Sequence, residues 1–210
     1  MFTLGHDVNR LRNDFYMYST DHQFMVTETS GDGLAEVDIH FSNRMYQAYY
    51  QLQHEKTHWL QYTVNAKCPD GIFVCIFQQD GVLWADFHIV ELKTTLTSQK
   101  WSEVLQQFRG GVLRALSFCG TLGIEKVREV HLYSCAVDKT KIENDFRSYQ
   151  AQYYTTGGVS RKRKTGVNYN DLMKWGQPIL QLFYSGGKCT HQFINLTRRS
   201  DGVNIGTLRI

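Results

Sequence analysis

Three residues near the middle of the chain have the types needed for metal-assisted hydrolysis: Asp70, Glu91 and Lys93. Two carboxylates can hold a divalent cation, and a neighbouring ammonium can hold a water molecule or help to deprotonate it. A nearby cation and partial burial would both lower the pKa of such a lysine, which suits the second role. This chemistry requires the fold to bring the three side chains together.

The stretch from Cys68 to Lys93 is predicted to form two strands joined by a tight turn at Asp80-Gly81. Both central residues of a type I′ turn need positive φ, and Asp-Gly is a strong signal for such a hairpin. Continued in step from that turn, the register places Asp70 opposite Glu91, with Cβ atoms about 5 Å apart. Lys93 shares the face of Glu91. Facing carboxylates repel, and a divalent cation between them would reverse that effect.

Two other aspartates lie in the same hairpin. Asp86 differs in parity from Glu91 on one strand, so without a bulge it points to the opposite face. Asp80 is explained as a turn residue. In the alternative interpretation, Asp70 and Glu91 are solvated carboxylates at a hairpin end and Lys93 is only an ion-pair partner.

Pro69-Asp70, followed by Glu91-Leu92-Lys93 at the end of the next strand, resembles the signature of the PD-(D/E)xK nuclease superfamily. The resemblance covers about residues 42–136 and implies an α/β fold with a restriction-endonuclease-like core, a central mixed β-sheet flanked by helices. It also implies that Asp70 and Glu91 bind Mg²⁺ or Mn²⁺, that the backbone carbonyl of Leu92 is a further ligand, and that Lys93 serves the attacking water.

The resemblance suggests roles for residues outside the hairpin. Some relatives carry a metal-binding glutamate on the helix before the sheet, which would be Glu55, although a surface glutamate is the other interpretation. Lys100 and Gln107 lie where relatives often contact substrate, and a solvated helix edge is the other interpretation. His54 and His58 are spaced for a metal pair on a helix, but the aspartate of a zinc-type motif is missing.

One strongly basic run lies in a predicted loop and consists of Arg161, Lys162, Arg163 and Lys164. The pattern alone matches a nuclear localisation run. In a nuclease the same residues would form an arm that neutralises phosphates. A solvated loop is the third interpretation.

Hydrophobic periodicity predicts the elements around the hairpin. The expected strands are Phe24–Thr29, Leu34–Phe41, Trp59–Ala66, Val127–Val137, Ile179–Tyr184 and Thr190–Leu196, and the expected helices are Ser42–Lys56, residues 99–119 and Lys141–Tyr154. Both faces of the central hairpin are apolar, which predicts strands covered on both sides. Gly120 is expected to end the second helix. Gly110-Gly111 within it predicts close approach of another backbone or a ligand, because each glycine otherwise costs about 1 kcal/mol.

The chain has 210 residues, 42% of them hydrophobic, with a net charge of +3. These values predict one domain over residues 1–210, with a core at about 42–137 and β-rich additions at both ends. No apolar run is long enough to span a bilayer, and no secretory pattern opens the chain. Five widely spaced cysteines suit reduced thiols in an intracellular protein, in the cytoplasm or nucleus.

The function expected is hydrolysis of phosphodiester bonds with Mg²⁺ or Mn²⁺, by endonuclease or exonuclease action. DNA is favoured over RNA as the partner because most of the resembled family cuts DNA. No membrane partner is expected, and a homodimer is left open. Two alternatives remain: an RNA endonuclease of the cap-snatching type, and a non-catalytic nucleic-acid-binding protein with the same fold.

Overall fold

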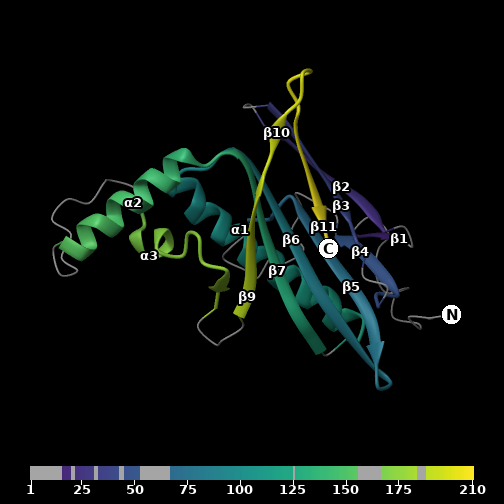
Figure 1. Cartoon of the computed structure of the whole chain (residues 1–210). Helices are drawn as coiled ribbons and strands as arrows, with labels where there is room; N and C mark the ends of the chain where they lie inside the picture. Colours follow the sequence, from purple (N-terminus) through teal and green to yellow (C-terminus); the bar gives the residue numbers. More distant parts are fainter. Residues whose placement is uncertain are drawn as a thin grey trace.

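The computed structural model describes residues 16–19, 22–30, 33–42, 45–52, 67–124, 126–155, 167–183 and 188–210. Within these ranges the chain is a mixed α/β protein with two β-sheets and three helices (Figure 1). The predicted strand Trp59–Ala66 lies outside the described residues, as do Glu55, His54, His58 and the basic run at 161–164. None of the described helices is long and apolar enough to cross a membrane.

The larger sheet has seven strands in the order β1-β4-β5-β6-β7-β9-β8. In that order they are Tyr16–Ser19, Ala48–Leu52, Gly71–Gln79, Val82–Thr95, Lys126–Asp138, Lys188–Asn195 and Ile179–Gln181. Neighbours from β1 to β6 are antiparallel, whereas β6, β7 and β9 run parallel. The predicted central mixed sheet is therefore confirmed.

The smaller sheet joins strands from both ends of the chain in the order β10-β11-β3-β2. These strands are Thr197–Arg198, Asn204–Arg209, Gly33–His40 and Gln23–Ser30. β2 and β3 match the predicted strands Phe24–Thr29 and Leu34–Phe41 and form an antiparallel hairpin, and β11 runs parallel to β3. Three helices complete the fold: α1 (Ser98–Thr121), α2 (Thr140–Thr155) and α3 (Tyr169–Leu172).

The β5–β6 hairpin is buried on both faces, as its composition predicts. Residues such as Val74 and Phe87 pack against Phe118 of α1. On the opposite face, Phe73 and Val90 pack against the apolar side of the smaller sheet. A helix therefore covers one face and a second sheet covers the other, where helices were expected to flank the sheet.

The predicted helix Ser42–Lys56 is wrong in its described part, because Ala48–Leu52 is the strand β4 between β1 and β5. Tyr50 and Leu52 pack toward α1, while Tyr49 packs toward the smaller sheet. A strand that is apolar on both faces also has apolar residues three and four apart, so its pattern imitates a helical stripe. The aromatic side chains favour the strand.

The helix α1 is confirmed, although its end differs from the prediction. Thr97 caps its first turn by accepting a hydrogen bond from the Lys100 N–H. The helix continues through Gly120 to Thr121, and Gly123 beyond the cap has a φ of 72°. Gly123 supplies the left-handed residue that ends many helices. The predictions for β7, α2, β8 and β9 are confirmed to within three residues at each described end.

Candidate active site

The β5–β6 hairpin has the predicted register, from Gln79 opposite Val82 at the turn to Gly71 opposite Val90 at the far end. Asp80 and Gly81 have φ values of 52° and 76°, which confirms a turn with two left-handed residues. The register leads directly to Asp70 and Glu91 as the next opposed positions. The hairpin therefore brings together two residues that are far apart in the sequence.

Asp70 is held at the end of β5 by the backbone of the neighbouring strand. Its Oδ2 accepts a hydrogen bond from the Leu92 N–H at 2.7 Å. The N–H and C=O groups of one strand residue point to the same side. The Leu92 carbonyl therefore also points toward the Asp70 side of β6, as the predicted third ligand requires.

Glu91 is fully buried, with a side-chain exposure of 0%. Its Oε1 forms an ion pair with the Lys93 ammonium, while its Oε2 has no hydrogen-bond partner among the described residues. Burial and then the Asp70 charge raise the pKa of Glu91, and with the opposing effect of Lys93 it lies at about 8. A buried carboxylate with one unpartnered oxygen next to a second acid is an arrangement that a cation would stabilise.

Lys93 lies beside Glu91 as predicted, and in the metal-free protein its pKa is raised above the ordinary value. The lowering expected from a neighbouring cation stays a prediction. Burial acts to lower this pKa, but the charge and hydrogen bond of Glu91, together with Asp70 and Glu28, raise it more. Acidic neighbours favour the charged form of a lysine. Among the charges of the protein itself, Lys93 is therefore a stable ammonium, which suits holding a water or a phosphate oxygen rather than removing a proton.

A fourth charged residue at this position, Glu28 of β2, was not predicted. Its Oε1 lies 3.8 Å from the Lys93 Nζ, although the two residues belong to different sheets. Glu28 has the same parity as Phe24 and Val26, which are buried on the inner face of β2. An acidic residue that continues an apolar stripe was the signal that could have revealed it.

The segment that carries Asp70 is pressed against α1. A Cβ on Gly110 would overlap the Lys67 carbonyl oxygen, and a Cβ on Gly111 would lie 2.8 Å from the Pro69 Cγ. This confirms the predicted close approach of another backbone. Gln107 Nε2 also donates to the Cys68 carbonyl at 3.4 Å.

Gln107 therefore contacts the chain just before Asp70, and Lys100 lies in the first turn of α1. Their predicted contacts with substrate remain predictions. Glu55 and the basic residues 161–164 lie outside the described residues, so the structure does not place them relative to the carboxylates.

Asp86 lies on the opposite face of β6, as its parity predicts, within a separate buried network. It forms a two-point ion pair with Arg128 and accepts hydrogen bonds from the Tyr46 hydroxyl at 2.8 Å and the Glu129 N–H at 3.1 Å. The β6–β7 register shifts by one residue at this point, which leaves Arg128 as the extra residue of a bulge. Both carboxylate oxygens of Asp86 therefore accept hydrogen bonds within this buried network.

The donor set at Asp70 and Glu91 fits Mg²⁺ or Mn²⁺. No cluster of three or more histidine, cysteine or acidic side chains suited to a metal occurs in the described part of the chain. Mg²⁺ needs only one or two carboxylates, because water and substrate phosphate complete its shell. The unpartnered Oε2 of Glu91 and the adjacent Asp70 carboxylate meet that requirement.

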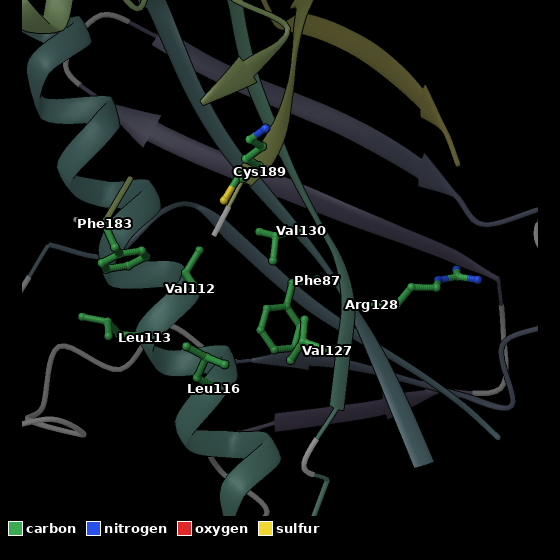
Figure 2. A pocket seen from close by; sticks show the side chains of 10 residues that line it. Phe87, Val112, Leu113, Leu116, Val127, Arg128, Val130, Phe183 and Cys189 are labelled. Carbon is green, nitrogen blue, oxygen red and sulfur yellow. The ribbon is translucent and has the colours of Figure 1, made fainter. Parts of the chain in front are cut away.

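A cavity of about 530 Å³ lies elsewhere, between α1 and the strands β6, β7 and β9. Figure 2 shows Phe87, Val127 and Val130 facing α1, with the Arg128 guanidinium directed away from the cavity. None of the predicted site residues lines it. The cavity is thus distinct from the carboxylate site.

Comparisons with protein-family models, with curated protein sequences and with solved structures find no significant match to the chain. The resemblance to PD-(D/E)xK nucleases therefore depends on the residues and contacts described above.

Proposed function

We propose that the protein is a metal-dependent nuclease that hydrolyses phosphodiester bonds, with Asp70 and Glu91 as its metal-binding carboxylates. The observation that carries the proposal is the state of Glu91. This carboxylate is fully buried, is paired on one oxygen with Lys93, is unpartnered on the other among the described residues, and lies beside Asp70. Such an arrangement is costly unless a cation binds there.

Each residue has a distinct role in this proposal. Asp70, Glu91 and the Leu92 carbonyl would hold Mg²⁺ or Mn²⁺, and the Asp70–Leu92 hydrogen bond fixes the first carboxylate. The bound ion would supply Lewis-acid chemistry, by polarising the phosphate and lowering the pKa of its water. Lys93, as an ammonium, would orient the water or a phosphate oxygen through a charge-assisted hydrogen bond.

A restriction-endonuclease-like core belongs to the same proposal. The order β5, β6, α1, β7 supports it, with α1 connecting two parallel neighbours. The helix expected before the sheet is replaced by β4 over Ala48–Leu52. DNA is proposed as the substrate, with RNA as the alternative.

A cleavage assay tests the proposal directly. Purified protein is incubated with linear, circular and single-stranded DNA and with RNA, in Mg²⁺, in Mn²⁺ and in EDTA. We expect product that requires the metal and is absent with Glu91→Ala.

A folded wild-type protein that shifts labelled nucleic acid but yields no metal-dependent product would support the non-catalytic alternative. Product from RNA alone would replace DNA by RNA as the substrate. Product that persists in EDTA would contradict the proposed mechanism.

A further inference from the structure

The Lys93 ammonium lies between two carboxylates from different sheets. It is paired with Glu91 Oε1 on its own strand, and Glu28 Oε1 from β2 lies 3.8 Å away. The Lys93 side chain is 14% exposed and that of Glu28 is 21% exposed, so neither group is fully surrounded by water. Charges that are partly buried interact more strongly than charges on the surface.

The proposed metal and Lys93 compete for the same carboxylate. A divalent cation on Glu91 would repel the neighbouring ammonium and would take over part of the negative charge that now holds it. Lys93 would then need another anionic partner in order to stay in its mostly covered position. Glu28 is already within reach of its Nζ.

We infer that Glu28 is a positioning residue that holds the Lys93 ammonium when a divalent cation occupies Glu91. This inference rests on the proposed function, since it assigns a role at the same site. Glu28 itself acts through Lys93 and not as a ligand of the metal. The inward parity of Glu28 on β2 makes the smaller sheet a part of the site.

The test is a double-mutant cycle in Mn²⁺ affinity, measured by isothermal titration calorimetry. The proteins are wild type, Glu28→Gln, Lys93→Met and the double variant. Partners outside the ligand shell typically change metal affinity by about 10- to 100-fold. We expect Glu28→Gln to weaken Mn²⁺ binding by at least about tenfold, because the ammonium then stays against the metal.

In the Lys93→Met background the same Glu28→Gln change should have less than about a threefold effect, since only a screened charge is lost. Glu36→Gln is the matched control. It removes the same charge from the neighbouring strand β3, at a position of opposite parity to the buried Ala35 and Val37. This control should leave the Mn²⁺ affinity within about twofold of wild type, because an outer-face charge is screened.

Two results overturn the inference while leaving the proposed function intact. One is an unchanged Mn²⁺ affinity in Glu28→Gln. The other is an equal loss of affinity in both Lys93 backgrounds, which would make Glu28 act on the metal directly. A wild-type protein that binds no Mn²⁺ refutes the proposed function, and the inference fails with it. Urea unfolding of all five proteins in EDTA separates these outcomes from simple misfolding.

Discussion

The carboxylates at the candidate site repel each other and are also partly or wholly removed from water. Burial and the Asp70 charge together raise the pKa of Glu91, which lies at about 8. Lys93 offsets this cost on one oxygen of Glu91. A site of this kind is less stable than an apolar one until a cation binds, so metal binding and stability should be linked.

Asp70→Asn should separate the effects of charge and shape. Asparagine can still accept the Leu92 N–H hydrogen bond through its carbonyl oxygen. Removing the charge should relieve repulsion by a few tenths to about 1 kcal/mol, so the variant should melt at or above wild type in EDTA. A saturating metal stabilises a protein by about 2.7 kcal/mol at about one hundred times Kd, and wild type should gain far more than the variant.

Differential scanning calorimetry of both proteins across a Mn²⁺ titration measures whether the wild-type melting temperature rises from at or below that of the variant to above it. Identical responses to metal in the two proteins would remove Asp70 from the ligand set.

Asp86 should matter for stability and not for metal binding. Asp86→Ala removes the acceptor of the Tyr46 hydroxyl, the Glu129 N–H and the partly exposed Arg128 guanidinium, which should cost about 1–3 kcal/mol of unfolding free energy. Asp80→Asn is the control, because asparagine also tolerates the positive φ at this exposed turn. This variant should change the free energy of unfolding by less than about 0.5 kcal/mol. Urea denaturation measures both values. A stable Asp86→Ala protein with lost Mn²⁺ affinity would mean that the metal site lies on the other face of β6.

At the scale of elements, α1 and the segment before β5 position the first carboxylate. Gly110 and Gly111 allow the backbone of residues 67–69 to lie directly on the helix. Gln107 and Arg114 then donate to the carbonyls of Cys68 and Lys67. The helix therefore acts on the site through the backbone that enters β5.

Two glycine-to-alanine variants of α1 test this contact. Gly110→Ala should destabilise the protein by more than about 1 kcal/mol, because its Cβ would overlap the Lys67 carbonyl oxygen. It should also weaken Mn²⁺ binding by displacing Asp70. Gly120→Ala lies in the same helix with nothing within 4 Å of its new Cβ, and it should stabilise by up to about 1 kcal/mol.

Urea unfolding measures the stability of both variants, and isothermal titration calorimetry measures their Mn²⁺ affinity. If Gly110→Ala were as stable as Gly120→Ala, the close approach would not exist in solution.

At the scale of the whole molecule, the layers bury several polar groups that must stay neutral. His191 packs against Trp101 and Phe108, and its Nε2 lies 2.9 Å from the Ser134 hydroxyl. Burial lowers the pKa of His191 from 6.5 to about 4, and burial also lowers the pKa of His88. Both histidines therefore resist protonation in the folded state.

This sets a direction for the pH dependence of stability. Because the folded pKa lies below the unfolded one, the unfolded state binds more protons as the pH falls below 6.5. His191 should therefore leave the free energy of unfolding unchanged above pH 6.5. It should lower that free energy by up to about 3 kcal/mol by about pH 4. Urea unfolding between these pH values should show a smaller loss of unfolding free energy for His191→Gln than for wild type. Equal slopes would mean that His191 titrates normally.

The basic run should carry nucleic-acid affinity and not chemistry. Changing Arg161, Lys162, Arg163 and Lys164 together to alanine should weaken binding and flatten its salt dependence. Each lost phosphate contact on duplex DNA should reduce the log–log slope by about 0.9. Fluorescence anisotropy in a salt series gives the slope, and the cleavage rate at saturating substrate should change little. An unchanged slope would exclude this run from the binding surface.

Features that depend on neighbours along the chain could be predicted from the amino-acid sequence. Asp80-Gly81 sets the turn, and the turn sets the register that opposes Asp70 and Glu91. Strand parity separates Asp86 from Glu91, because side chains alternate on any regular strand. The glycine pair in α1 predicted a close contact for the same local reason, since glycine in a helix is unfavourable without one.

Features that depend on which helices and strands pack together became clear from the folded structure. The pattern of Tyr49 and Leu52 suits a helix or a strand, and pairing with β1 and β5 selects the strand. Glu28 reaches Lys93 from another sheet, across a distance in sequence that no local pattern spans. The same packing places acids around Lys93 and raises its pKa, because a pKa depends on charges close in space rather than on neighbours in sequence.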